Sequence, residues 1–251
     1  MKKDKEFFDN QFINYNSVYG NAWGMNWRVY MKLRTCASLD ETLKYIAAHD
    51  YAKILEIGCA SGDFTNNYIE ATGPGHQIIG SDISELAVNI CKKRFEKYKN
   101  ASFLNIALPA IGMKNVACII CMDVLEYFDE RGKKECLVAM KDALSDNGIL
   151  ICQLPLDKED EEAFLNLFSE IFQVEVKRYV YGKIWYKYFD QWLVLLVNAF
   201  LLGKRWGIIG KIIGKIAYKI CCSEKIVSFW FNINEKFFPQ KRSHMVLVGR
   251  K

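Results

Sequence analysis

Between residues 53 and 154, five short apolar runs are interspersed with segments of helical periodicity. A short apolar run is typical of a strand that is covered on both faces, and strand–helix–strand units join with right-handed crossovers. The pattern therefore predicts an α/β fold with a mostly parallel sheet and helices on both of its faces. The predicted strands are 53–57, 77–81, 101–106, 116–122 and 149–154. Helices are expected at 63–71 and at 85–98, the second capped by Ser84, and a turn is expected at 147–148.

Two later predicted strands, 172–178 and 244–249, have no helical crossover of this kind between them. We expect them to form an antiparallel hairpin at the edge of the sheet, separated by an insert of roughly 60 residues. A helix start is also expected near Asp40 or Ser38, which are suitable capping residues. The expected parts are an N-terminal helical segment or lid at 1–48, a core at 49–178, a helical insert at 179–242 and a final core strand at 243–251.

The cysteines indicate a reducing compartment. There are nine of them, scattered along the 251 residues, and the first ten residues lack the apolar stretch of a signal peptide. We therefore expect a cytoplasmic location, and the basic segment described next adds a peripheral place on the inner face of the membrane as one alternative. Cys118 and Cys121 have C-x-x-C spacing, but no second pair accompanies them and they lie in an apolar run, so no metal site is expected.

The net charge of +5 is unevenly distributed. Residues 179–242 hold 11 Lys and Arg against 3 Asp and Glu, a net +8 that leaves −3 for the other 187 residues. In the run GIIGKIIGKIAYKI, Lys211, Lys215 and Lys219 share one helical face and isoleucines occupy another. This pattern favours an interfacial membrane helix within 180–240 over nucleic acid binding, which uses stacking side chains. The alternative is a helical subdomain that covers the active site and keeps its lysines in solvent.

The chemistry is concentrated in the segment EIGCASGDFT, residues 56–65, where a strand runs into a small-residue turn that opens a helix. Small residues let the backbone approach a ligand closely, and the helix start offers unpaired N–H groups. Asp82 follows the second strand, 20 residues after Gly62, where a carboxylate can accept hydrogen bonds from ribose hydroxyls. The alternatives to ligand binding are that the turn is a plain tight connection and that Asp82 is an acid that merely starts a helix.

Two ligand classes compete for this geometry. A dinucleotide needs the spacing G-x-G-x-x-G, whereas this chain has G-x-x-x-G with Ala60 between its glycines. Glu56 also places a carboxylate near the turn, which suits a pyrophosphate poorly. It suits a ligand that carries an ammonium group and a sulfonium cation, namely S-adenosylmethionine.

These motifs resemble those of class I S-adenosylmethionine-dependent methyltransferases. EIGCASGDFT is similar to their first motif, GSDISELAV to the second, CIICMDVLEYFDE to the fourth strand and following helix, and LSDNGILICQLP to the fifth strand. Together with WRVYMKLR at 27–34, the segments most resemble the nodulation-type N-methyltransferases, which act on amino sugars of lipo-chitooligosaccharides. The resemblance covers roughly residues 20–156. It implies a Rossmann-like methyltransferase fold with a seven-stranded, mostly parallel sheet, an antiparallel last strand and a helical insert before it.

The resemblance also assigns roles to individual residues. Glu56 would meet the methionine amino group, directly or through water, and Asp82 would hold the ribose. Asn105 stands where family members often have an acid that reads the adenine amino group, so it is either a replacement acceptor or an ordinary loop residue. The other implied cofactor residues are Gly58, Ala60 and Gly62 along the methionine part, Ile83 against adenine, and Cys121, Met122 and Asp123 near the sulfonium.

No residue in the sequence identifies itself as a general base. Glu126 and Tyr127 follow the fourth strand, at the edge where open α/β sheets bind ligands, and are the candidates for acceptor contact or proton handling. A helix-start acid beside a packed ring would give the same pattern. The three histidines, including His244 at the start of the last strand, are expected to be structural or solvated.

We therefore expect an enzyme that methylates an oxygen or nitrogen of an amphiphilic, sugar-containing or lipid-linked acceptor near a membrane surface. The first alternative is a soluble small-molecule methyltransferase whose insert is a substrate lid. The others are an NAD-dependent oxidoreductase, which the missing third glycine and Glu56 oppose, and a membrane adaptor that kept a fold without catalysis. The sequence does not predict an oligomeric state.

Overall fold

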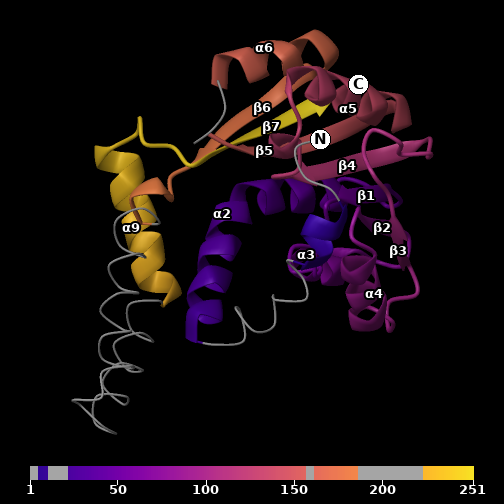
Figure 1. The fold of residues 1–251 in the computed structure, drawn as a ribbon, viewed down its shortest axis with the longest axis horizontal. Helices are drawn as coiled ribbons and strands as arrows, with labels where there is room; N and C mark the ends of the chain where they lie inside the picture. Colours follow the sequence, from indigo (N-terminus) through magenta and orange to yellow (C-terminus); the bar gives the residue numbers. More distant parts are fainter. Residues whose placement is uncertain (1–4, 11–21, 157–160, 186–222) are drawn as a thin grey trace, which may run out of the picture. The chain divides into compact units, whose positions relative to one another are not determined.

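The computed structural model describes residues 5–10, 22–156, 161–185 and 223–251 (Figure 1). Its central element is a seven-stranded sheet with the strand order β3-β2-β1-β4-β5-β7-β6. Neighbouring strands from β3 to β5 pair in parallel, and β7 runs antiparallel to β5. The predicted α/β class, the parallel sheet and the antiparallel last strand are confirmed. The strands are β1 (Lys53–Ile57), β2 (Gln77–Asp82), β3 (Ala101–Asn105), β4 (Val116–Met122), β5 (Leu144–Pro155), β6 (Gln173–Val180) and β7 (His244–Arg250).

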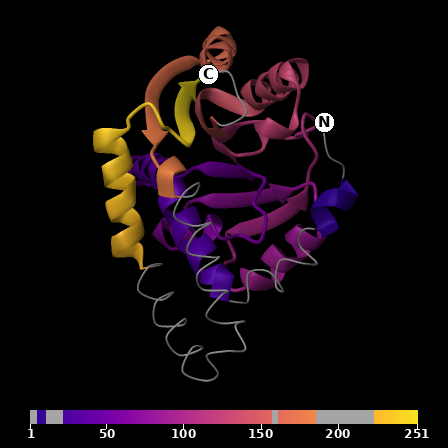
Figure 2. The same cartoon turned by 60° about the vertical axis from the view of Figure 1, so that its left-hand side comes forward.

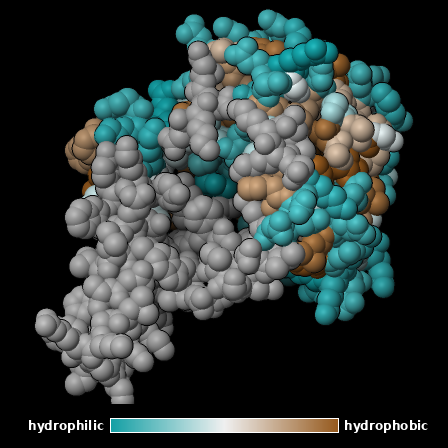
Figure 3. Space-filling model, in the orientation of Figure 1, coloured by the Kyte–Doolittle hydropathy of each residue, from teal (hydrophilic) through white to brown (hydrophobic). Residues whose placement is uncertain are grey.

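Helices cover the sheet because successive strand residues point to opposite faces. Leu55 and Ile57 of β1 belong to the main core together with apolar side chains of α5 (Glu130–Ala143) and α6 (Glu161–Ile171). Glu56, between them, points to the opposite face and bonds to α3 (Thr65–Tyr68). The outer sides of these helices are polar: in Figure 3 hydrophilic residues dominate the regions of α5, α6 and α4 (Glu85–Arg94), with hydrophobic residues gathered between them.

The chain divides into two compact units. The first contains the whole sheet up to Tyr179, together with Met1–Ile13 and the last strand; the second contains Asn14–Thr35 and Val180–Ser243. In the second unit α9 (Glu224–Phe237), the yellow helix in Figure 2, packs Val227 against Trp185, and both side chains are buried.

A polar residue secures the loops of this second unit. The Asn234 side chain accepts a hydrogen bond from the Ile184 N–H at 3.0 Å and donates to the carbonyls of Phe238 and Lys241. Because Asn234 is fully buried, these bonds compensate for its desolvation. None of the described helices has the length and apolar character needed to cross a bilayer.

Several local predictions were wrong. No helix begins near Asp40, because α2 runs without a break from Ala22 to Ala47. Ser38 is not a cap: its hydroxyl donates to Gln153, and Asp40 pairs with Arg178. The expected turn at 147–148 lies within β5, whose pairing with β4 shifts register there.

The extent and position of other elements also depend on tertiary packing, so some differ from the prediction and some agree with it. The helix expected at 63–71 is a short α3 followed by a 3₁₀ turn at Ile69–Ala71. The last two strands are neighbours at one end of the sheet, as expected, but β7 lies between β5 and β6, so β6 is the edge strand there. The Ser84 cap of α4 is confirmed, since its hydroxyl accepts from the Ala87 N–H at 3.2 Å.

Two sequence expectations concern residues that the structure leaves out. The lysine-bearing amphipathic helix around Lys211 lies within 186–222, outside the described residues. In the N-terminal segment expected as helical or as a lid, Tyr15 and Tyr19 also lie outside, and α2 is described at Trp23 and Trp27 only as a backbone.

Candidate active site

The turn after β1 uses small residues because its backbone adopts conformations that larger side chains resist. Gly58, Ala60 and Gly62 have φ angles of +78°, +50° and +78°, in the left-handed region that glycine enters without strain. A Cβ added at Gly58 would lie 2.4 Å from the Val124 side chain, and one at Gly62 would lie 2.4 Å from the Phe95 ring. The turn is therefore packed tightly against the loop after β4 and against the end of α4.

Glu56 lies directly before this turn and is buried, with 1% of its surface exposed. Its Oε2 accepts hydrogen bonds from the Thr65 hydroxyl at 2.7 Å and the Tyr68 hydroxyl at 2.8 Å. Burial raises the pKa of the Glu56 carboxyl from 4.5 to about 7, although the two hydroxyl donors oppose the shift. In the folded chain this carboxyl is therefore easily protonated near neutral pH.

Asp82 ends the neighbouring strand and fixes the turn from the side. Its Oδ2 accepts from the Ala60 N–H at 3.0 Å and its Oδ1 from the Ser84 N–H at 2.8 Å. Burial raises the pKa of the Asp82 carboxyl, and the two N–H donors partly oppose this. Asn105 donates to the carbonyls of Asp82 and Ile83, at 2.9 and 2.8 Å, so its amide holds the loop that follows β2.

Two buried carboxyl groups thus flank one backbone turn, and burial disfavours the negative charge of both. A cation bound between them would compensate for that cost, whereas a pyrophosphate would add to it. These residues fit S-adenosylmethionine, because its ammonium and sulfonium groups are positive and its ribose hydroxyls are donors. Glu56, Asp82 and the turn would hold it.

The end of β4 brings the remaining predicted residues to the same edge of the sheet. Cys121 is fully buried in the main core, whereas Met122 at the end of the strand is partly exposed. Asp123 follows with a φ of +56°, a strained value for a residue with a side chain. Glu126 and Tyr127 lie in the 3₁₀ turn Leu125–Tyr127 and are partly buried, and their catalytic roles stay predictions.

The C-x-x-C pair does not form a shared site. Cys118 and Cys121 are three residues apart in β4, so their side chains point to opposite faces of the sheet. Burial raises the pKa of both thiols. Within the described residues, no three His, Cys, Asp or Glu side chains are grouped as a metal ion would require.

A short N-terminal helix adds contacts that the sequence did not reveal. Residues 5–10 are helical and lie beside the start of α4 in both views (Figures 1 and 2). Asp9 forms a short hydrogen bond with the Ser84 hydroxyl, and the Phe8 ring meets the Tyr127 ring edge-on, with 5.0 Å between their centroids. The segment therefore reaches from the loop after β2 to the loop after β4, on either side of the glycine turn.

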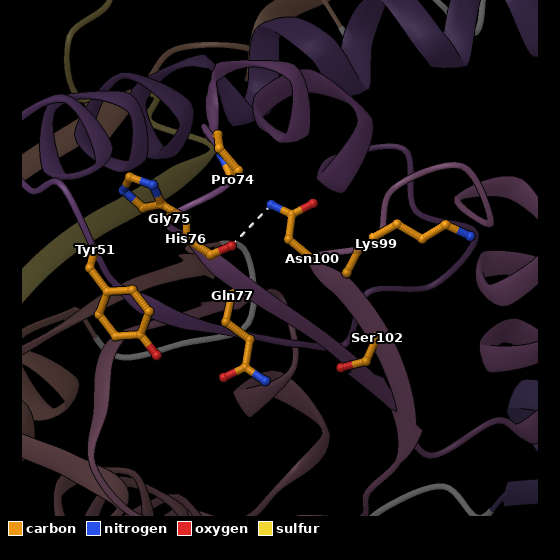
Figure 4. A pocket seen from close by; sticks show the side chains of 9 residues that line it. Tyr51, Pro74, Gly75, His76, Gln77, Lys99, Asn100 and Ser102 are labelled. Atoms are coloured by element: carbon orange, nitrogen blue, oxygen red, sulfur yellow. Dashed lines mark hydrogen bonds between the residues drawn. The ribbon is translucent and has the colours of Figure 1, made fainter.

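A cavity of about 250 Å³ lies away from the glycine turn, at the amino ends of β1, β2 and β3 (Figure 4). His76 lines it, but within the described part of the chain both of its buried ring nitrogens lack a hydrogen-bond partner. Because neither nitrogen is accessible, this cavity does not offer the imidazole to a ligand. Its lining residues are Tyr51, Pro74, Gly75, His76, Gln77, Lys99, Asn100, Ala101 and Ser102.

Comparison with known proteins agrees with this geometry. Residues 55–150, which include the glycine turn, Asp82 and β4, match a family described as a methyltransferase domain. The chain carries a methyltransferase domain. Together with the fold, this match supports an S-adenosylmethionine-dependent methyltransferase. A search of curated protein sequences found no match.

Solved structures show the same fold at low sequence identity. The N-methyltransferase NodS from Bradyrhizobium japonicum WM9 is 13% identical, with a TM-score of 0.51 over 88% of this chain and 83% of its own. Magnesium protoporphyrin IX methyltransferase from Synechocystis PCC 6803 is 19% identical, with a TM-score of 0.57 over 70% and 87%. The cyclopropane synthase MmaA2 from Mycobacterium tuberculosis is 13% identical, with a TM-score of 0.58 over 86% and 84%.

Proposed function

We propose that this methyltransferase transfers the methyl group of S-adenosylmethionine to an oxygen or nitrogen of an amphiphilic or sugar-containing acceptor at a membrane surface. When bound, the cofactor supplies a methyl group already activated by a positively charged sulfur. The chain's own residues then have to bind the acceptor, orient it toward the methyl group and exclude water. The observation that supports the membrane part is the exposed face of α9.

This face combines phenylalanines with lysines. Phe229 and Phe237 are 56% and 61% exposed, and Phe238, directly after the helix, is 41% exposed. Phe229 and Phe237 are separated by two turns and about 80°, so they lie on one side of α9. Lys225 and Lys236 project close to the same side, and the Lys236 ammonium lies 5.5 Å from the Phe237 ring centroid.

Such a face is unfavourable in water and favourable in the headgroup region of a bilayer. Aromatic rings bury apolar area there, and lysines meet anionic headgroups. The sequence adds the lysine-bearing segment around Lys211 to the same basic insert. We infer that this insert delivers an amphiphilic acceptor by holding the enzyme at the lipid surface.

The test compares flotation of the full chain on vesicles containing phosphatidylglycerol with that of Phe229→Ser/Phe237→Ser. Burial of one phenylalanine contributes up to about 1.5–3 kcal/mol, so the double variant should bind at least about tenfold more weakly. Val138→Ser is the matched control, since Val138 on α5 is 42% exposed but lies outside the basic insert. Equal flotation of wild type and double variant would contradict the membrane part and favour the insert as a substrate lid.

The acceptor is sought with methyl-labelled S-adenosylmethionine and separate membrane and soluble extracts. We expect the label in a lipid-extractable product of the membrane fraction. Label confined to soluble small molecules would argue against an amphiphilic acceptor while leaving the methyltransferase activity in place.

A further inference from the structure

A second polar cluster lies at the carboxyl edge of β4 and β5. It contains Ser38 of α2, Asp123 after β4, Gln153 of β5 and His244 at the start of β7. Because β7 runs antiparallel to β5 and pairs His244 with Pro155, the first residue of β7 reaches the edge where the parallel strands end. Residues far apart in the sequence are thereby brought to one place.

Asp123 lies at the centre of this cluster. The Gln153 amide nitrogen is 3.5 and 3.4 Å from its two carboxylate oxygens, and His244 Nε2 is 3.8 Å from Oδ1. Ser38 in turn donates to the Gln153 side-chain oxygen at 2.9 Å, which orients the amide nitrogen toward Asp123. The Gln153 and His244 donors lie at the long end of hydrogen-bond distance or beyond it, as is common for catalytic groups before substrate binds.

The four side chains of this cluster differ in how far they are exposed. Ser38 and Gln153 are fully buried and His244 is 4% exposed, whereas the Asp123 side chain keeps 14% of its surface exposed. Asp123 is thus the member that a substrate can reach. The next residue, Val124, packs against Gly58 of the cofactor turn.

The Asp123 backbone gives an independent indication. Its φ of +56° costs strain that glycine would avoid, and its N–H is held by the Gln153 carbonyl at 2.9 Å. The surrounding bonds therefore maintain a strained conformation that directs a carboxylate to the site edge.

We propose that Asp123 is the proton acceptor of the methyl-transfer reaction and that His244 and Gln153 are its positioning residues. The acceptor's O–H or N–H group donates to the Asp123 carboxylate. Its heteroatom forms a bond to the methyl carbon as the carbon–sulfur bond breaks, the electron pair stays on sulfur, and the proton passes to Asp123 and then to water. The acceptor atom therefore carries a proton before transfer.

This inference rests on the methyltransferase identification and is independent of membrane contact. The test uses the full chain with methyl-labelled S-adenosylmethionine and whichever of the membrane and soluble extracts takes the label, and measures cofactor affinity by calorimetry in parallel. Asp123→Asn keeps the shape and tolerates the same φ but cannot accept a proton. We expect its transfer rate to fall by about 10²–10⁴-fold with cofactor affinity changed less than threefold.

His244 is tested by conservative rescue. His244→Leu should slow transfer by about 10–100-fold, the range for partners that orient a reacting group. His244→Gln, whose amide nitrogen can replace Nε2, should recover most of the rate. Asp129→Asn is the matched control: Asp129 caps α5 through the Gly132 N–H, and asparagine caps equally well.

Three outcomes would overturn the proposal: unchanged transfer in Asp123→Asn, equal loss of transfer and cofactor affinity in it, or Glu126→Gln losing the rate while Asp123→Asn keeps it. Failure of every variant and the wild type to bind S-adenosylmethionine would instead count against the cofactor assignment.

Thermal unfolding adds a readout that needs no acceptor. A purely structural cluster predicts lower melting temperatures for Asp123→Asn and His244→Gln, whereas the proposal predicts little change.

Discussion

At position 56 the chain keeps a carboxyl group whose negative charge the fold disfavours. A buried acid with a pKa of about 7 is costly in its charged form, since among the described residues two hydroxyl donors, Thr65 and Tyr68, compensate for lost water. A cationic ligand would remove this cost. If Glu56 holds the cofactor as predicted, the stability of the free protein and its affinity for the cofactor oppose each other at this residue.

The first prediction concerns stability. The pKa of Glu56 is about 7 in the folded chain and 4.5 ordinarily. Its protonated form therefore contributes to the free energy of unfolding fully below pH 4.5, and this contribution is lost as the pH rises through about 7. Glu56→Gln should therefore raise the free energy of unfolding by about 1–3 kcal/mol at pH 8 and by much less at pH 5. Urea unfolding at the two pH values measures this, and an equal effect at both would contradict it.

The second prediction concerns cofactor binding. A cation binds the charged form of Glu56, so the free protein must release a proton whenever the pH is below about 7. Affinity for S-adenosylmethionine should therefore increase between pH 6 and pH 8, by up to about tenfold per pH unit at the acid end. Calorimetry in buffers of different ionisation enthalpy would detect the proton release. Glu56→Gln should bind more weakly and lose this part of the pH dependence; an unaltered profile would argue against Glu56 as the group responsible.

At the scale of elements, residues 5–10 connect the loops after β2 and β4 through Asp9–Ser84 and Phe8–Tyr127. An edge-on aromatic pair contributes about 0.5–1.5 kcal/mol. If the pair closes the cofactor site, Phe8→Ala should speed dissociation of S-adenosylmethionine by about two- to tenfold, measured by stopped-flow fluorescence. Tyr51→Ala is the control, because Tyr51 is an exposed aromatic residue at the amino ends of the strands, away from the glycine turn. Equal dissociation rates in wild type and Phe8→Ala would exclude a closing role.

The elements themselves were predictable where their signals are local. Five parallel strands followed from apolar runs, and the Ser84 cap of α4 followed from residue type. The continuous α2 was not predictable, since Ser38 is a good capping residue by type and only its buried bond to Gln153 shows its use.

The same division holds for the site. The glycine turn, Glu56 and Asp82 are encoded in one short motif and a fixed spacing, so the sequence located them. His244 was expected to be structural or solvated. Its contact with Asp123 was not predictable, because it depends on the antiparallel insertion of β7 beside β5. One signal was available: the first residue of an antiparallel last strand lies at the carboxyl edge of its parallel neighbours.

At the scale of the whole molecule, charge is divided between the insert and the remainder of the chain. Residues 179–242 carry +8 and the other 187 residues −3. A molecule with this division should meet an anionic membrane with its insert, because the remaining residues are weakly repelled. On the proposed membrane contact, charge would guide the encounter and the exposed phenylalanines of α9 would supply the part of the binding free energy that does not depend on salt.

These two contributions predict different responses to salt. Screening shortens the Debye length from roughly 14 Å at 0.05 M to about 6 Å at 0.3 M, and each lysine near an anionic surface contributes about 1 kcal/mol before screening. Wild type should bind phosphatidylglycerol vesicles at least about tenfold more weakly at 0.3 M than at 0.05 M NaCl, and should bind neutral phosphatidylcholine vesicles weakly at both. Phe229→Ser/Phe237→Ser should keep the salt response at low salt but lose the binding that remains at 0.3 M. Salt-independent binding, or equal binding to both lipids, would show that the basic charge of the insert serves another partner.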